Sequence, residues 1–170
     1  MLSNMMKELI NTQINQEFYS AYLYLAFSNY YYGRGLDGFA HWFDVQAHEE
    51  IDHAALFRAY LCSQDAAVEF DAIGRPNVDL KDPIDPLRAA LSHEQGITSM
   101  IDDIYSAADG EHDYRTMEFL RWFIREQNEE EQNAADLVRK FNLYGSDPRG
   151  LYMLNEELRA RTYSAPSLEL

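Results

Sequence analysis

The chain has 170 residues, enough for one domain with a substantial core, and its formal net charge of −15 argues against nucleic-acid binding, which requires a basic face. No stretch approaches the roughly 20 apolar residues of a membrane-spanning helix, and the N-terminus lacks the basic and apolar regions of a signal peptide. With the lone Cys62 unable to form an internal disulfide, we expect a cytoplasmic protein that binds neither nucleic acid nor membrane.

Apolar periodicity predicts four long helices, over residues 4–32, 36–63, 85–108 and 114–143. The break at 33–35 is short, so the first two helices should be antiparallel neighbours. The connection 64–86 is unusually long, holds one glycine and three prolines, and shows little helical periodicity. Because it is long enough to cross the length of a bundle, the third helix could run parallel to the second.

Polar residues mark where several of these helices begin and end. Ser3 or Asn4 is a candidate N-cap for the first helix, and Asp113 for the fourth. Gly145 ends the fourth helix, and Asp147 with the proline after it starts a short fifth helix that runs to about residue 160. We therefore predict an all-α fold: a four-helix up-down bundle with a long crossover and a short C-terminal helix over 1–160, followed by an irregular tail over 161–170.

One stretch combines a carboxylate and an imidazole on an apolar helix face. Glu50 and His53 are three residues apart in the second predicted helix, so they are neighbours on one face, within or beside its apolar stripe. A charged carboxylate without a partner is costly to remove from water, and a metal ion is one partner that resolves the conflict. The Glu-x-x-His pattern therefore points to metal ligands, although so short a pattern also occurs in surface pairs.

The other three long helices carry polar residues in the same situation, among apolar neighbours at helical spacing: Glu17, Glu94, Gln127 and Glu130. The whole set is related by a constant offset, because Glu17, Glu50 and His53 recur 77 residues later as Glu94, Gln127 and Glu130. This triple coincidence suggests two helix pairs related by a pseudo-two-fold axis, with ligands from all four helices converging. Carboxylate and imidazole ligands suit iron.

At these positions the sequence resembles the ferritins, in particular the non-haem bacterial ferritins. The resemblance covers nearly the whole chain and rests on the crossover, the fifth helix and a set of residues: Glu17, Tyr24, Glu50, His53, Glu94, Glu126, Gln127, Glu129 and Glu130. The chain departs from the bacterioferritins at two points. They have Glu-x-x-His twice, whereas the second pair here is Gln127-x-x-Glu130, and Ile51 stands where they carry a haem-binding methionine. We therefore expect no haem.

The resemblance implies an iron-storage protein with ferroxidase activity, in a hollow cage of 24 identical subunits. It implies that Glu17, Glu50 and His53 hold a first iron ion. Glu94, Glu130 and the shared Glu50 would hold a second. This di-iron site would oxidise Fe(II) with dioxygen or peroxide, and the Fe(III) product would be mineralised inside the cage.

Further residues near this set have two readings. Gln127 is a neutral amide that binds iron weakly or not at all, but could donate a hydrogen bond to a bound oxygen species. Bacterial ferritins have a third iron site, and the matching residues here are Glu49, Glu126, Glu129 and Glu130; the plainer reading of such acidic residues is a solvated helix face. Tyr24, on the face of Glu17, either packs in the core with its hydroxyl satisfied or forms a hydrogen bond to the site and donates electrons to it. Trp122, on the face of Glu130, is a second candidate electron donor.

Three other functions share parts of this pattern. A di-iron oxidase or peroxidase of the rubrerythrin kind would favour a second Glu-x-x-His and often a cysteine pair, which this sequence lacks. A DNA-protecting miniferritin places its ligands between subunits and has no fifth helix. A purely structural bundle would pair its buried carboxylates with Arg or Lys.

Overall fold

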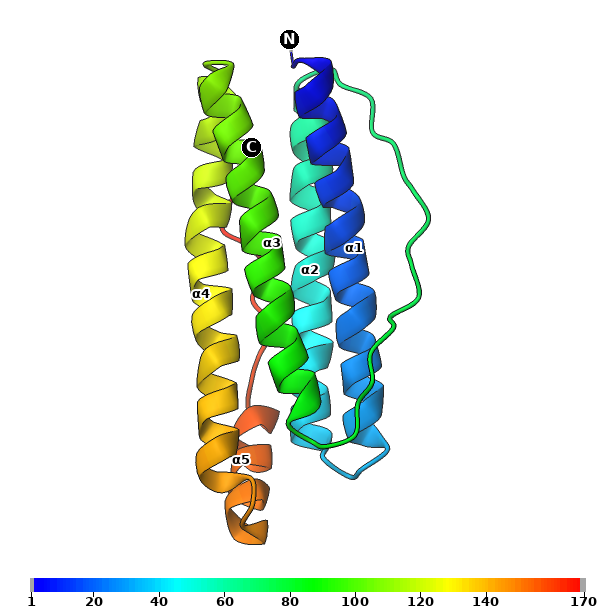
Figure 1. Cartoon of the computed structure of the whole chain (residues 1–170), viewed down its shortest axis with the longest axis vertical. Coiled ribbons are helices and arrows are strands. Elements are labelled where there is room, and N and C mark those ends of the chain that lie inside the picture. The colour runs from blue at the N-terminus through cyan, green and yellow to red at the C-terminus, as the bar shows by residue number, and fades with distance from the viewer. Residues whose placement is uncertain (1, 169–170) are drawn as a thin grey trace.

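The computed structural model describes residues 2–168, which form five helices and no strand. The helices are α1 (Asn4–Tyr32), α2 (Asp37–Ser63), α3 (Asp85–Gly110), α4 (Tyr114–Tyr144) and α5 (Pro148–Arg159). Figure 1 shows the first four side by side as a bundle, with α5 folded back at one end. The predicted all-α bundle with a fifth helix is confirmed, and each predicted long helix is correct to within two residues at either end.

Side-chain caps fix three of the helix starts where the sequence predicts them. The side chain of Ser3 accepts a hydrogen bond from the backbone N–H of Met6, 3.1 Å away, and Asp113 caps α4 in the same manner. Asp147 accepts from the N–H of Gly150 at 2.7 Å, which begins α5 next to a proline at its first position. These bonds satisfy N–H groups that a helix start otherwise leaves without partners.

The start of α2 is capped by a residue from the other end of the chain. The buried Asn155 of α5 accepts through its side-chain oxygen from the N–H of Gly38, at 2.9 Å, while Leu36 at the cap position offers no side-chain bond. A Cβ atom on Gly38 would lie 1.7 Å from the carbonyl oxygen of Asn155, so only glycine permits this approach. The contact fixes α5 against α2 and α4 and so determines where the following residues begin.

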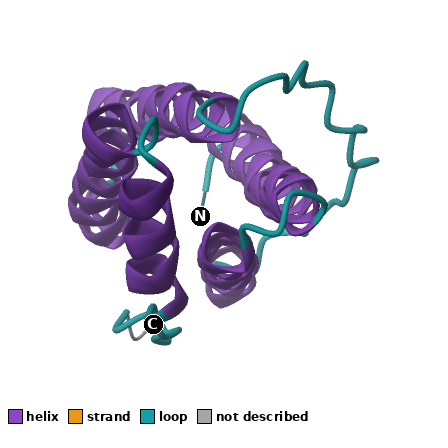
Figure 2. Ribbon diagram, turned by 90° about the horizontal axis from the view of Figure 1, so that it is seen from below, coloured by secondary structure: helices purple, strands orange, loops and turns teal. Residues whose placement is uncertain are grey.

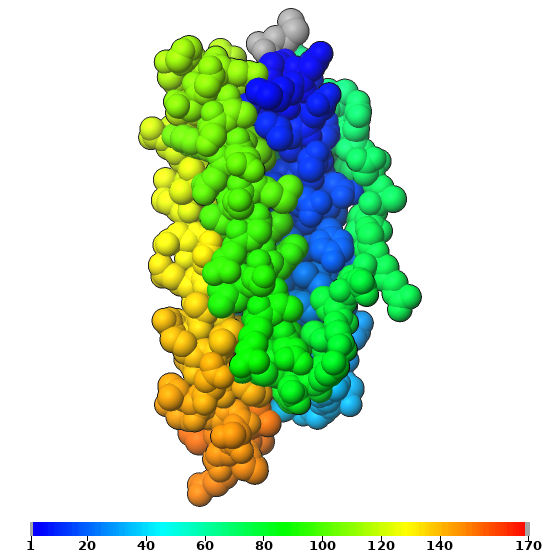
Figure 3. All heavy atoms as spheres, in the orientation of Figure 1, coloured from blue at the N-terminus to red at the C-terminus, as the bar shows by residue number. Residues whose placement is uncertain are grey.

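The long crossover makes α2 and α3 parallel. It leaves α2 at one end of the bundle and enters α3 at the other (Figure 1), lies outside the ring of helices when seen along the bundle (Figure 2), and runs beside α1 on the surface (Figure 3). Two asparagines of α1 hold its first part: the Asn11 amide donates to the carbonyl of Ala67 at 3.2 Å, and Asn15 donates to that of Asp71. Among the described residues, no helix is both long and apolar enough to span a bilayer.

The apolar core is divided into two clusters. One cluster, which we call the upper core, contains Met6, Phe57, Ile101 and Phe119, and the other, the lower core, contains Phe27, Phe43, Leu87 and Leu137. Between these clusters each of the four long helices turns polar side chains inward, and these side chains are nonetheless buried. The burial of apolar surface at both ends therefore offsets the free-energy cost of burying these polar side chains in the centre.

Candidate metal centre

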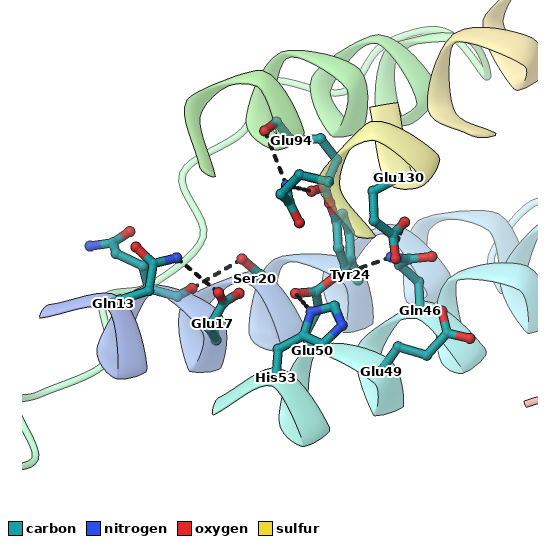
Figure 4. Close-up of polar contacts among 12 residues, drawn as sticks. Gln13, Glu17, Ser20, Tyr24, Gln46, Glu49, Glu50, His53, Glu94 and Glu130 are labelled. Carbon is teal, nitrogen blue, oxygen red and sulfur yellow. Dashed lines mark hydrogen bonds and ion pairs between the residues drawn. The ribbon is translucent and has the colours of Figure 1, made fainter. Parts of the chain in front are cut away.

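Six polar side chains converge in this centre: Glu17 from α1, Glu50 and His53 from α2, Glu94 from α3, and Gln127 and Glu130 from α4. They are the two sets related by the 77-residue offset, and every one is 1% to 5% exposed. Figure 4 shows the labelled members approaching one another from all four helices. Along the part of the chain that the structure describes, no Lys or Arg forms an ion pair with the four buried carboxylates, so the pairing expected of a purely structural bundle is not found.

The first group is Glu17, Glu50 and His53, whose ligand atoms all lie within 4.8 Å of one another. The His53 Nδ1 atom lies 3.4 Å from the Oε2 atom of Glu50. Oε2 of Glu17 is buried with no hydrogen-bond partner. A buried carboxylate oxygen without a donor is costly, so this position fits a cation.

A second group joins His53 to the other side of the centre. Its ligand atoms, from His53, Glu126 and Glu130, also lie within 4.8 Å of one another. His53 and Glu130 are buried and Glu126 is half-buried, so the group leads from the centre toward the surface. One imidazole is thus common to two adjacent sets of ligands.

Glu94 completes the centre and already has two donors. The Tyr24 hydroxyl donates to Oε1 of Glu94, and the Gln127 amide nitrogen donates to Oε2 at 3.0 Å. Both donors are buried. Each donor binds a different oxygen of Glu94 and so orients this carboxylate, as hydrogen bonds from neighbouring residues do for a metal ligand.

The electrostatics of the centre favour protons or cations at the carboxylates. Burial raises the pKa of Glu17, Glu50 and Glu130 well above the usual range, and repulsion between neighbouring carboxylates adds to this effect. Burial also raises the pKa of Glu94, although the hydrogen bonds that it accepts act in the opposite direction. Burial and the nearby charge of Glu94 raise the pKa of the Tyr24 phenol, which remains a donor. A metal ion entering here would replace protons.

Two buried amides that the sequence analysis did not single out support the ligands. The Gln46 amide nitrogen donates to Oε2 of Glu130 at 2.8 Å and to Oε1 of Glu50 at 3.1 Å. The Gln13 amide donates to Oε1 of Glu17 at 2.8 Å. Each amide stands four residues before the glutamate on its own helix, and this spacing is the signal that could have identified it.

The residues expected near a third site are only partly brought together. Glu126 lies in the second ligand group, whereas Glu129 is exposed and belongs to neither group found among the described residues. Glu49 is half-buried and forms an ion pair with Arg161, which lies beyond α5. Burial raises the pKa of Glu49, and the charge of Arg161 opposes that shift. This pairing was not predicted from the sequence.

The aromatic residues next to the centre are in contact with its ligands. The ring centroid of Trp122 lies 5.7 Å from that of His53, and Tyr24 is bonded to Glu94. His93 is not part of either ligand group: its Nε2 atom lies 2.7 Å from the hydroxyl of Ser20, and burial lowers its pKa to about 4. A neutral, hydrogen-bonded imidazole fits a packing role.

Comparisons with known proteins agree with this geometry. Residues 7–144 match the family model described as the ferritin-like domain. The chain is 36% identical over 159 residues to a bacterial non-heme ferritin of Campylobacter jejuni, covering 94% of this chain and 95% of that protein. It is 34% identical over 163 residues to one of Staphylococcus aureus, covering 96% and 98%. The open pore ferritin of the archaeon Archaeoglobus fulgidus superimposes with a TM-score of 0.93 at 37% identity, covering 95% of this chain and all of that one.

Proposed function

Because this chain belongs to the ferritin family, we propose that it stores iron, and that its buried centre oxidises Fe(II) to Fe(III) before storage. The observation that carries this proposal is the convergence of four buried carboxylates and one imidazole from four helices, with no Lys or Arg of the described chain to neutralise them. Oxygen and nitrogen ligands of this kind suit iron. Iron is here the substrate and the stored cargo.

We assign two adjacent iron positions. The first uses Glu17, Glu50 and His53. This assignment is supported by their ligand atoms, which all lie within 4.8 Å of one another. The second uses Glu94 and Glu130 with Glu50 shared, so that Glu50 bridges the two ions. Two ions bound side by side can deliver two electrons to one molecule of dioxygen or peroxide, each Fe(II) giving one electron.

The surrounding residues hold the ligands and manage protons. Gln46 fixes one oxygen each of Glu50 and Glu130, which leaves their other oxygens for metal. Gln127 uses its amide N–H on Glu94, so we assign it to the positioning of that ligand. Tyr24 donates to the same carboxylate and stays protonated, which suits it to supply a proton or an electron at the edge of the centre.

We also propose a third iron position at Glu49, Glu126 and Glu129, sharing Glu130 with the second ion. The half-buried Glu126, within reach of His53 and Glu130, supports a route from the catalytic pair to the surface by exchange between carboxylates. Replacing Glu49, Glu126 and Glu129 with Ala should leave the first oxidation fast and change later turnovers. Stopped-flow oxidation of successive small iron additions tests this, and identical multi-turnover kinetics would exclude the third position.

For storage we propose a hollow cage of 24 subunits. Large apolar side chains are exposed on several elements, including Tyr22 and Tyr32 on α1, Phe70 in the crossover and Met153 on α5. We propose that neighbouring subunits of the cage cover part of this exposed apolar surface. We expect the cytoplasm as its compartment, where the exposed free thiol of Cys62 would stay reduced. Sedimentation velocity would give the number of subunits.

The central experiment counts iron and then supplies the oxidant. Anaerobic titration should show two tightly bound Fe(II) ions per chain, and dioxygen should then oxidise them rapidly. His53→Ala should weaken mainly the first ion, and Glu94→Ala the second. Binding of fewer than two ions per chain, or oxidation no faster than that of free Fe(II), would contradict the proposed function.

A further inference from the structure

The residues that follow α5 lie along α2 toward the centre and do not project into solvent. We call residues 160–168 the C-terminal strap; Figure 1 shows this segment rising from α5 along the bundle. The carbonyl of Arg161 lies 2.9 Å from the Nε2 atom of His41, the Tyr163 hydroxyl donates to Asp52, and the Trp122 indole N–H donates to the Ser167 hydroxyl at 3.3 Å. These contacts hold the strap over the side of the centre where Glu49 lies.

Arg161 makes the strap's contacts with the centre. Its Nη1 atom donates to Oε1 of Gln46 at 2.8 Å and to the carbonyl of Trp42 at 3.3 Å, and its Nη2 atom donates to Glu49. The guanidinium carbon lies 4.2 Å from the centroid of the Trp42 ring. Trp42, Gln46 and Glu49 are four and three residues apart, so one face of α2 supplies a stacking surface, an acceptor and a counter-charge.

This ion pair differs from the others on the surface. The side chains of Arg161 and Glu49 are 19% and 18% exposed, whereas those of Arg159 and Glu156, a pair within α5, are 48% and 43% exposed. Exposed pairs contribute little, while a partly buried pair that is also stacked and hydrogen-bonded holds its partners more firmly. Glu49 therefore already has a cation.

We propose that Arg161 is a resident cation that competes with metal ions for Glu49, so that iron can occupy the third position only when the guanidinium leaves. This inference rests on the proposed function, because it concerns the carboxylate through which iron would pass from the catalytic pair. A guanidinium and a divalent cation on one carboxylate repel each other, and the ion that binds there must displace Arg161.

The same side chain is linked to the first two positions through Gln46. Because Oε1 of Gln46 accepts from Arg161, its amide nitrogen must face Glu50 and Glu130, as observed. Arg161 is thus a positioning residue for these ligands while the strap is docked. When a third ion displaces Arg161, the Gln46 amide would be free to move. Occupancy of the third position would therefore affect the ligands of the first two positions.

Zinc provides a test that does not depend on oxidation, because Zn²⁺ is redox-inert and accepts carboxylate and imidazole ligands. Equilibrium titration of the assembled full-length protein would count bound zinc. Tryptophan emission would report the strap, since Trp42 stacks on Arg161 and Trp122 bonds to Ser167. We expect two tight zinc ions per chain, and a weaker third whose binding shifts the emission.

Arg161→Ala should tighten the third zinc ion by roughly tenfold, as loss of a partly buried competing charge predicts, and should abolish the emission shift. Arg159→Ala is the matched control, because it removes the same charge two residues away and should change neither. Arg161→Lys keeps the charge but not the fork-shaped donor, so its third-ion affinity should stay near that of the wild type. In a Glu49→Gln background, Arg161→Ala should not change the affinity of the third zinc ion.

Equal third-ion affinity in Arg161→Ala and Arg159→Ala would overturn the proposal, and so would weaker binding in Arg161→Ala, which would mean that the strap builds the position. If the alanine variant fails to assemble, Arg161→Gln, which keeps much of the side chain but removes its charge, replaces it, and a third-ion affinity equal to that of the wild type would then exclude competition. If the first two zinc ions failed to bind, the proposed metal centre itself would be contradicted. The titration distinguishes this failure from a change in the third ion, which depends on Glu49.

Discussion

The two buried amides beside the ligands support different metal positions, so replacing each one should affect the second ion differently. Gln46→Leu removes a donor at 2.8 Å from Glu130 and another at 3.1 Å from Glu50. Gln13→Leu removes a single donor, at 2.8 Å from Glu17. Leucine is similar in size to glutamine, so both changes keep the packing of these buried positions while deleting the hydrogen bonds.

The structure sets the expected sizes of the two effects. Loss of a hydrogen bond that orients a metal ligand lowers metal affinity by about 10- to 100-fold. In Gln46→Leu the second ion loses support at both Glu50 and Glu130, so its affinity should fall by roughly 100-fold, whereas the first ion loses support only at Glu50 and should weaken by about tenfold. In Gln13→Leu the first ion should weaken by about tenfold and the second should be unaffected.

Cobalt(II) offers a suitable assay, because its visible absorption reports each ion as it binds. Titration of the metal-free protein should resolve two successive equivalents, with the first ion weakened in both variants and the second ion weakened only in Gln46→Leu. Thermal unfolding of both metal-free variants provides the control for folding. If the second ion were weakened equally in both variants, the loss would come from general packing, and the role of the amides in orienting ligands would be refuted.

Three further outcomes follow from the centre. Glu50→Ala should abolish rapid Fe(II) oxidation, because it removes the bridging ligand from both ions; near-normal initial rates would exclude the bridge. The purified protein should contain no haem, since Ile51 offers no ligand, and a stoichiometric Soret band would contradict this. Burial raises the pKa of Glu17 and Glu50 above that of an unfolded glutamate, so the unfolding free energy of the metal-free protein should fall as pH rises from about 4 through the raised values. Binding of Zn²⁺ at neutral pH should restore this free energy and release protons, which calorimetry would measure. If the stability of the metal-free protein increased over this pH range, the carboxylates could not be buried in this way.

Local sequence signals account for most of the fold. Caps at Ser3, Asp113 and Asp147 act within three residues of their own position, so a pattern of neighbours is sufficient to find them. The 77-residue offset was similarly informative about the centre, because buried polar residues stand out against an apolar stripe. All six residues that it relates are buried in the structure.

Contacts between distant parts of the chain could not be predicted in this way. Asn155 caps α2 from 117 residues away, and Arg161 meets Glu49 from 112 residues away, in a segment without periodicity. Gln13 and Gln46 escaped notice for a different reason. A neutral amide on an apolar face is a weaker anomaly than a carboxylate, and its partner is known only after the helices are packed.

The division of the core into an upper and a lower cluster has a consequence for how ions reach ligands that are almost inaccessible to solvent. Apolar packing holds the helices together at both ends of the bundle, whereas the middle of the bundle is held by hydrogen bonds among buried polar side chains, whose burial is unfavourable. Local opening is cheapest where apolar contacts are fewest, so amide hydrogens near Glu50 should exchange faster in the metal-free bundle than those of either core. An ion bound to ligands from all four helices would stabilise this middle region and suppress the local opening through which the ion entered.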